Sequence, residues 1–570
     1  MRISFFKISV VLFCLILLYG AIYFIRTIWF RPDNIHYYFL RFPYSYAQVF
    51  PEEASVVEIP QANLLSPYQS YLNNVPSPPF SPTTFWSNVE TTLEGYRENE
   101  LSEEEVFHQK NLLWVSQHLK DSAVRQMETP SFHPHAGIER ELIHLLDVIQ
   151  QVGNPNEAEY FLSRLKRFDT KVDLYLERVP LAFRDSLSQY LYVKHLEELI
   201  DLPIEKHPIY RAFARKAIAA DPTQLNESEA ARLLGEVSRE LAGAFKRSLQ
   251  RILDRVLEQS FSTNYPESRS SGLSYAQSLT YYTSLNLDPD SLHEASLSAL
   301  DSLISLDTLN LSEKKDVEIE PENFLDSLRN MQAYVRQVSS GLFELPIQAP
   351  LEIQFSHVSE KNLPLWAGYE FVLDSEKGRG LLLVPRDSSF QIPLGHWLPY
   401  LCYIGIPGIH SLNAAQWNEA TTPYIHRQFL SFPSFEQGWG LYSVATLQQE
   451  IGIFSQNTQA YQGYLTLLKE AVSRVIVDTG IHTQGWSFLE ASKFMNTHSK
   501  LSQDEIHKEI LCIFRRPGYF STPWVGFQAF MKVRWEEEAQ LGDEFYLQDF
   551  HARILRVGPG TFSAFRQRGR

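Results

Sequence analysis

The chain has 570 residues, and its 67 acidic side chains outnumber the 51 lysines and arginines, which gives a formal net charge of -16. This acidic balance argues against a nucleic-acid-binding protein, because phosphate recognition needs a basic surface. Three cysteines exclude a disulfide scaffold, and a hydrophobic content of 44% is typical of a folded globular protein. We expect more than one packed lobe at this length, since a single hydrophobic core stops growing at roughly 250–300 residues.

An apolar run extends from Ile8 to Ile25 and has basic residues on both sides. As a helix it measures about 27 Å, close to the ~30 Å thickness of a bilayer hydrocarbon core. The run therefore predicts an N-terminal transmembrane helix within residues 1–31. We expect residues 8–25 of this helix to span the membrane. The basic residues are nearly balanced across the run and leave its orientation open, although we expect the large domain outside the cytoplasm.

Two other kinds of N-terminal segment fit this run less well. A cleaved signal peptide needs small residues at its cleavage site, but tyrosines flank the only small pair, Gly20-Ala21. A lipoprotein attached through Cys14 needs a small residue before the cysteine, where Phe13 stands. The interpretation as an uncleaved anchor is therefore favoured.

Residues 32–82 are rich in proline, serine and tyrosine, and the most proline-dense part is Val75-Pro-Ser-Pro-Pro-Phe-Ser-Pro82. This composition disfavours helix and predicts an extended linker, or an arm that lies over the following domain.

Helical periodicity dominates the rest of the chain. Apolar residues recur with the i, i+3, i+4, i+7 spacing near 142–149, 249–257 and 297–304, which is typical of the buried faces of helices. Residues 351–355, 369–373 and 381–384 instead favour strands and predict a small β-meander. The predicted fold class is therefore mainly α, with a minor sheet between residues 351 and 384.

Most familiar catalytic motifs are absent from the sequence. It contains no Gly-x-Ser-x-Gly elbow, no phosphate-binding loop and no His-Glu-x-x-His pair. A nucleophile elbow, a nucleotide site and the commonest zinc-peptidase motif are thereby excluded.

Several motifs in the C-terminal half resemble those of the bacterial domain-of-unknown-function family numbered 885 (DUF885). The strongest is Arg474-Val-Ile-Val-Asp-Thr-Gly-Ile-His-Thr-Gln-Gly-Trp486, which is similar to the family signature R-x-V-x-D-T-G-I-H-x-x-G-W. Leu287-Asp-Pro-Asp-Ser-Leu-His293, Phe435-Glu-Gln-Gly-Trp439 and Asp549-Phe-His551 resemble further family motifs in the same order. Together these matches are far more specific than any one of them.

The resemblance is clearest from residue 265 to 565 and implies one DUF885-like helical domain over residues 83–570. Members of the family look like zinc metallopeptidases, so the resemblance implies a two-lobed helical body around a central cleft. Zinc would be the cofactor of a member with an intact metal motif.

The metal motif of the family, H-E-x-x-P-G-H-H, is degenerate in this chain. Tyr403 and Ile404 stand at the positions of the first His and of the Glu that acts as general base, and Ile409 replaces one of the terminal His pair. Gln437 stands where the family has an acidic residue in F-x-E-G-W. A catalytic zinc site normally has three protein ligands, and isoleucine cannot transfer a proton. His410 is the only candidate ligand left at the motif, so we expect no metal, no cofactor and no catalytic residue.

Some polar and aromatic residues are candidates for lining the predicted cleft: His410, Trp439, Asp478, His482, Trp486 and Tyr519. Asp478 could instead cap a helix, and both histidines could be buried residues bonded to backbone carbonyls. We also expect Pro407-Gly408 to form the turn that carries the chain past the degenerate site.

Three functional hypotheses remain open at this point. The first is a membrane-anchored, non-catalytic metallopeptidase homologue whose cleft binds a peptide or a partner protein. The second is an active hydrolase with a rebuilt metal site, or with a metal-free mechanism that uses His410, His482 and Tyr519. The third is a purely structural envelope protein. The substitutions at the metal motif favour the first.

Overall fold

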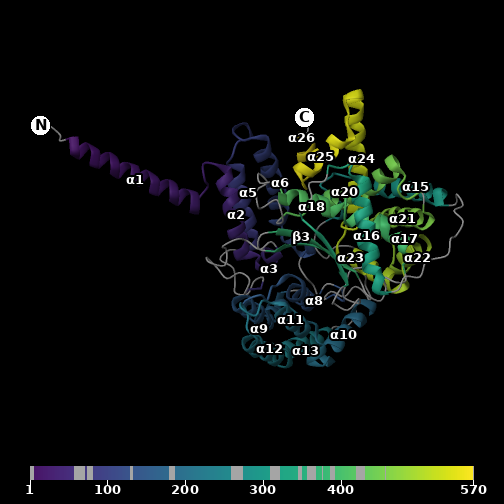
Figure 1. Ribbon diagram of the computed structural model, residues 1–570, viewed down its shortest axis with the longest axis horizontal. Coiled ribbons are helices and arrows are strands. Elements are labelled where there is room, and N and C mark those ends of the chain that lie inside the picture. Colours follow the sequence, from purple (N-terminus) through teal and green to yellow (C-terminus); the bar gives the residue numbers. More distant parts are fainter. Residues whose placement is uncertain are drawn as a thin grey trace.

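The computed structural model describes residues 5–56, 71–72, 81–128, 133–135, 137–178, 186–258, 274–307, 321–344, 349–355, 368–374, 377–384, 392–418, 430–455 and 457–568. Helices dominate these residues, and the prediction of a mainly α fold is confirmed. Figure 1 shows α1 (Phe5–Trp29) projecting away from the rest of the molecule.

The prediction of a transmembrane helix is wrong. Among the residues that the structure describes, no helix combines the length and the apolar character needed to cross a bilayer.

Part of the predicted linker is helical, contrary to its composition. Residues 32–82 contain α2 (Ile35–Val49) and α3 (Pro51–Val56), whereas most of the proline-dense part, at 73–80, lies outside the described residues. Phe42 of α2 is buried, with its ring 5.7 Å from that of Phe85 and 6.2 Å from that of Trp86. Burial of aromatic rings at helical spacing outweighs the low helix propensity of this segment.

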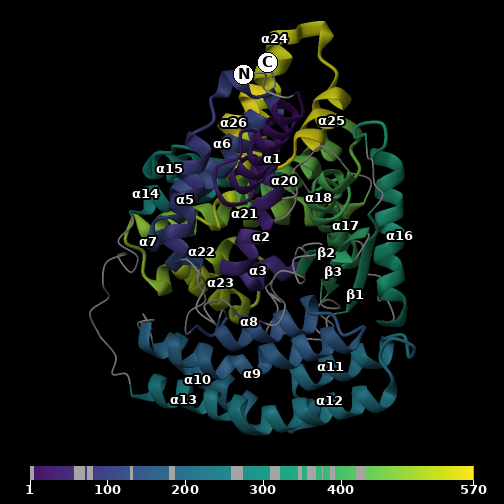
Figure 2. The ribbon, with the colours of Figure 1, turned by 90° about the vertical axis from the view of Figure 1, so that its left-hand side faces the viewer.

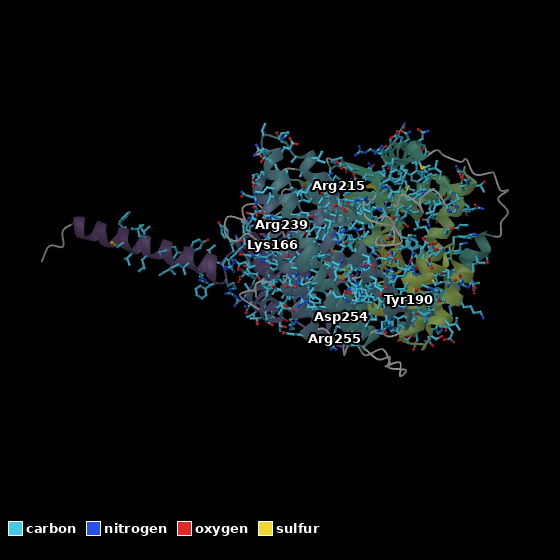
Figure 3. The ribbon with its side chains drawn as sticks, turned by 90° about the horizontal axis from the view of Figure 1, so that it is seen from below. Lys166, Tyr190, Arg215, Arg239, Asp254 and Arg255 are labelled. Carbon is cyan, nitrogen blue, oxygen red and sulfur yellow. The ribbon has the colours of Figure 1, made fainter. Side chains whose placement is uncertain are left out.

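A helical lobe forms a layer below the rest of the molecule in Figure 2. It consists of α8 (Ile138–His144), η3 (Leu145–Ile149), α9 (Pro155–Arg178), α10 (Ser186–Asp201), η4 (Ile204–Lys206), α11 (Pro208–Ala219), α12 (Glu227–Glu240), η5 (Leu241–Phe245) and α13 (Lys246–Leu257). These helices share one hydrophobic core, which includes Leu249, Ile252 and Val256 of a predicted stripe. Charged side chains such as Lys166 and Arg239 lie on its outer surface (Figure 3).

The remaining helices build a main body around a second core. They are α2 and α3 with α5 (Pro82–Glu94), η2 (Glu98–Glu100), α6 (Glu103–Leu119), α7 (Ser122–Glu128), α14 (Tyr275–Thr283), α15 (Pro289–Asp307), α16 (Pro321–Ser339), α17 (Leu394–Ile404), α18 (Ile409–Asn418), α20 (Pro433–Ile451), α21 (Thr458–His482), α22 (Phe488–His498), α23 (Gln503–Arg515), α24 (Thr522–Leu541), η8 (Gly542–Glu544), α25 (Leu547–Val557) and α26 (Phe562–Arg568). Helices α20 and α24 approach closely, because a Cβ at Gly438 would lie 2.5 Å from the Cα of Gly526. The two separate cores give the molecule two packed parts.

The sheet lies in the main body where it was predicted, but it is not a meander. Its strands are β1 (Leu351–Phe355), β2 (Gly368–Asp374) and β3 (Lys377–Val384), in the order β1-β3-β2. β1 runs parallel to β3 and β2 runs antiparallel to it, with Ile353 opposite Leu382 in the first pair and Tyr369 opposite Leu382 in the second. The helices α16 and α18 pack beside this sheet, and α17 shares a hydrophobic cluster with it.

A buried arginine of the helical lobe holds the N-terminal arm in place. The guanidinium of Arg164 donates to the carbonyls of Tyr71 at 3.0 Å and Pro51 at 3.2 Å, and also to the hydroxyl of Ser55. Lys171 of the same helix lies 2.6 Å from Glu52. α3 therefore connects the two parts, since its residue Ala54 belongs to the core of the main body.

Candidate functional site

The degenerate metal motif lies between α17 and α18. Residues 405–408 form the turn that was expected at Pro407-Gly408, and the Ile406–Pro407 peptide bond is cis. A Cβ at Gly408 would lie only 2.0 Å from the carbonyl oxygen of Tyr403, so this close passage of the backbone requires glycine. Tyr403 and Ile404 therefore lie at the end of α17, and Ile409 and His410 lie at the start of α18.

Both isoleucines of the motif are part of a hydrophobic core. Ile404 and Ile409 are 7% and 9% exposed and pack in one cluster with Leu382 of the sheet and Trp397 of α17. This cluster offers no polar atom at the positions where the family has a general base and a metal ligand. The apolar side chains here serve packing.

His410 is fully buried and points at the sheet. Its Nε2 lies 3.2 Å from the carbonyl oxygen of Ala349, and its Nδ1 lies 3.1 Å from the hydroxyl of Tyr369. The carbonyl accepts only, so we assign the proton to Nε2, which leaves Nδ1 to accept from Tyr369. Burial lowers the pKa of His410 to about 4. Its two ring nitrogens are thus both engaged in hydrogen bonds within the protein.

Tyr403 lies close enough to Arg474 of α21 for the two charges to interact. A Cβ at Gly440 of α20 would lie 2.8 Å from the ring of Tyr403, so this ring is packed against the α20 backbone. Burial raises the pKa of the Tyr403 hydroxyl, whereas the charge of Arg474 lowers it. The tyrosine fills space where the family has a histidine.

Gln437, a substituted motif position, and Tyr519, a candidate cleft residue, meet in the structure. The amide nitrogen of Gln437 donates to the Tyr519 hydroxyl at 3.2 Å, and the hydroxyl of Thr522 lies 2.9 Å from the amide oxygen. The guanidinium of Arg516 lies 3.9 Å from the centre of the Tyr519 ring. The amide of Gln437 and the hydroxyl of Tyr519 are therefore hydrogen-bonded to each other. The sequence analysis did not identify Thr522 as part of this group.

Asp478 is fully buried and accepts hydrogen bonds from the turn that precedes α24. Its carboxylate accepts from the backbone N–H of Gly518 at 3.0 Å and from the hydroxyl of Ser521 at 2.9 Å. Burial raises the pKa of Asp478 to about 7, although these hydrogen bonds lower it. Asp478 thus fixes α21 to the 516–521 turn and does not cap a helix.

The next residues of the same signature also make structural contacts. The hydroxyl of Thr479 lies 2.7 Å from Nδ1 of His293, which is the histidine of another family motif. A Cβ at Gly480 would lie 2.5 Å from the Trp486 ring, so glycine allows the half-buried indole to pack on α21. His482 is buried, and its Nε2 donates to the carbonyl of Ile513 at 3.1 Å. This part of the signature holds the scaffold together.

Trp439 lies in the core of the main body. Its indole N–H donates to the carbonyl of Pro407 at 3.1 Å, and its ring is fully buried. His551, in another family motif, is buried beside it and lies 2.9 Å from the hydroxyl of Tyr442 through Nε2. The indole of Trp439 therefore stabilises the 405–408 turn through its hydrogen bond to Pro407.

These positions do not form one polar centre. Tyr519 contacts Gln437, and Asp478 binds the turn beside Tyr519, whereas the hydrogen bonds of His410 go to Tyr369 and Ala349. Within the described part of the chain, no three His, Cys, Asp or Glu side chains are grouped so that they could hold a metal ion. A zinc ion with three protein ligands does not fit the residues present at the motif.

The solved structures that share this fold include two candidate lipoproteins. One is a candidate lipoprotein from Colwellia psychrerythraea, with a TM-score of 0.80, 16% identity, and coverage of 94% of this chain and 98% of that chain. The other is a candidate lipoprotein of unknown function from Shewanella oneidensis, with a TM-score of 0.66, 13% identity, and coverage of 93% and 99%. At these identities the likeness shows the fold.

The search for curated relatives found no match. The model of the family described as "Bacterial protein of unknown function (DUF885)" matches residues 401–568, which include the degenerate motif and the Arg474–Trp486 signature. The resemblance seen in the sequence motifs is thus confirmed over this part of the chain, which is similar to the DUF885 family.

Proposed function

We propose that this protein is a non-catalytic DUF885 member that has kept the family scaffold and uses it to bind a peptide or a partner protein. The observation that carries this proposal is the packing of the side chains at the degenerate metal motif. Ile404 and Ile409 belong to a hydrophobic core, and both ring nitrogens of His410 are engaged. A base and a metal ligand have been replaced by groups that pack.

The scaffold contacts support a retained binding role. The Asp478 carboxylate holds the 516–521 turn, and Thr479 contacts His293, although the described residues contain no set of metal ligands for them to position. A protein that keeps the frame around a lost site has the rigid elements that recognition requires.

The full-length protein, purified in detergent, tests the loss of metal chemistry. We expect no stoichiometric zinc by elemental mass spectrometry and no peptidase activity that a chelator abolishes. The matched control is the quadruple variant Tyr403→His, Ile404→Glu, Ile409→His and Gln437→Glu, in which metal binding is expected to return if the scaffold folds around it.

The opposite result would establish the alternative, an active hydrolase. Near-equimolar zinc in the wild-type protein, with peptide hydrolysis lost on chelation and in His410→Ala, would contradict the non-catalytic assignment. Hydrolysis that persists without metal but disappears in His482→Ala would contradict it as well.

We further propose that the N-terminal segment associates with a membrane surface outside the cytoplasm. α1 projects from the body, and its apolar side chains are exposed, for example Leu12 at 60% and Ile16 at 61% (Figure 1). The two solved structures of the same fold are described as candidate lipoproteins, which supports this location. Cell fractionation of the full chain and of a variant lacking residues 1–30 tests it, since only the full chain should sediment with membranes.

A further inference from the structure

The two edges of the three-stranded sheet differ in what covers them. β1 and β2 are the outer strands, because the strand order is β1-β3-β2. At the β1 edge, α16 packs beside the strand, and the guanidinium of Arg329 donates to the carbonyl of Ile353 at 2.9 Å. Figure 2 shows α16 next to β1. The β1 edge is therefore covered by a helix that also occupies one of its backbone acceptors.

The hydrogen bonds of the central strand determine which backbone groups of β2 point outward. The N–H of Gly380 in β3 donates to the carbonyl of Pro350 at 2.8 Å, so the backbone of Gly380 is directed toward β1. In the antiparallel register Gly380 lies opposite Phe371, and two opposite residues bond either to each other or both away from each other. Phe371 therefore directs its N–H and C=O away from β3. Leu373, two residues further along the strand, does the same.

These outward backbone groups, which we call the β2 edge, have no hydrogen-bond partner in the part of the chain that the structure describes. No hydrogen bond connects the backbone of Phe371 or Leu373 to another described element, in contrast to Ile353 at the opposite edge. An unpaired strand edge presents a row of donors and acceptors that matches the backbone of another extended chain. The β2 edge is therefore complementary to an extended peptide.

The two faces of the sheet contact different parts of the molecule. On one face, the ring of Phe371 lies 6.2 Å from the imidazole of His410 at the degenerate metal motif. On the other face, Leu381 and Leu383 of β3 pack with Val148 of the helical lobe. Successive side chains of a strand point to opposite faces of its sheet. A strand added at the β2 edge would therefore direct its side chains alternately toward the motif and toward the helical lobe.

We propose that the β2 edge binds an extended peptide segment of a partner protein, which adds to the sheet as a fourth strand. Main-chain hydrogen bonds to Phe371 and Leu373 hold the peptide and supply affinity that does not depend on its sequence. Its alternate side chains face the main body and the helical lobe, and these contacts supply selectivity. This inference rests on the proposed function, because it names where and in which conformation the peptide binds.

Residue-resolved hydrogen exchange of the full-length protein tests this geometry. Without peptide, the amides of Phe371 and Leu373 should exchange faster than the amide of Val372, which is directed toward β3. The probe is an acetylated and amidated hexapeptide of alternating valine and serine. It should slow the exchange of Phe371 and Leu373 at least about tenfold and leave Val372 unchanged. The control is the same peptide with every backbone nitrogen methylated, which cannot donate to a strand and should have no effect.

A pair of variants at one position isolates the backbone donor. Leu373→Pro removes an outward N–H, and proline is compatible with an edge strand at such a position. This variant should bind a fluorescent form of the probe at least about tenfold more weakly than the wild-type protein. Leu373→Ala keeps the N–H and should bind like wild type. If Leu373→Pro unfolds at a lower temperature than Leu373→Ala, the exchange comparison on the wild-type protein decides the question.

The proposal is overturned if the probe does not bind the wild-type protein, or if the methylated peptide binds equally well. It is also overturned if the probe binds while the exchange of Phe371 and Leu373 is unchanged. That last outcome contradicts the β2 edge and leaves the proposed binding role intact, because the peptide then binds elsewhere. Near-equimolar zinc with chelator-sensitive hydrolysis would instead contradict the proposed function, and elemental analysis measures it independently of the probe.

Discussion

Glu470 is a carboxyl group with an unusual environment in the main body. It is 3% exposed, and it lies 3.6 Å from Arg474, which also binds Glu509 at 2.6 Å. Two buried carboxyl groups thus share one guanidinium. Burial raises the pKa of Glu470 to about 7, while Arg474 opposes this shift and Glu509 adds to it.

Stability should therefore fall as the pH rises through the titration of Glu470. The folded-state pKa is above the unfolded value of 4.5, so the contribution of this group is complete below pH 4.5 and is lost as the pH passes 7. In Glu470→Gln this loss should be absent, so the variant should gain on the order of 3 kcal/mol relative to wild type between pH 4.5 and 8.

Chemical denaturation of both proteins at pH 5 and pH 8 measures this difference. Glu490→Gln is the control, because Glu490 is an exposed residue of α22 and its folded-state pKa is lowered. A constant difference between wild type and Glu470→Gln at the two pH values would show that Glu470 does not titrate in this range.

Single residues also show where sequence reasoning ends. The motif around Asp478 predicts this residue either as a cleft candidate or as a helix cap. In the structure Asp478 binds Gly518, which lies 40 residues later in the sequence. Its neighbour Thr479 contacts His293, which lies 186 residues earlier. Residue types and local spacing carry no information on such distant pairs, so the candidates were found while their roles were not.

The sheet shows the same limit at the scale of elements. Strands were predicted at 351–355, 369–373 and 381–384 and lie at 351–355, 368–374 and 377–384. Their β-branched and aromatic content indicates extended structure, but it does not specify which strands pair. The central position of β3 follows from its burial between the other strands and the helices of the main body.

Gly380 of β3 allows α18 to pack against the sheet. A Cβ at this position would lie 2.4 Å from Nδ1 of His410. In Gly380→Ala the imidazole must move and lose a hydrogen bond, so we expect a destabilisation of about 1–3 kcal/mol.

Urea denaturation measures this effect, with Gly235→Ala as the matched control. Gly235 lies within α12 and has open space around its Cα, so alanine should stabilise that helix by about 0.5–1 kcal/mol. Equal stability of Gly380→Ala and wild type would contradict the packing of His410 on β3.

At the scale of the molecule, Arg164 joins the helical lobe to the N-terminal arm. Its guanidinium is fully buried and donates to Pro51, Tyr71 and Gln150. Arg164→Met leaves several buried acceptors without a donor, so we expect a loss of roughly 3 kcal/mol or more and faster hydrogen exchange in α3.

Hydrogen exchange followed by mass spectrometry compares this variant with Arg239→Met, a change on the outer surface of the lobe (Figure 3). The surface variant should exchange like wild type. Unchanged exchange in α3 of Arg164→Met would show that the other contacts of the arm, such as the Lys171–Glu52 ion pair, are enough to hold it.

The contact between α6 and the C-terminal segment has a consequence for the synthesis of the chain. Asn111 accepts a hydrogen bond from the backbone N–H of Thr561 at 3.0 Å, across 450 residues, and α26 packs against α6. Domains generally fold as they leave the ribosome, N-terminal parts first. Here the first helices of the main body cannot complete their core until α26 has been translated, whereas the helical lobe has all its helices by residue 257. The nascent chain should therefore carry a folded lobe between two unfinished parts of the main body, which need protection from aggregation until α26 has been made.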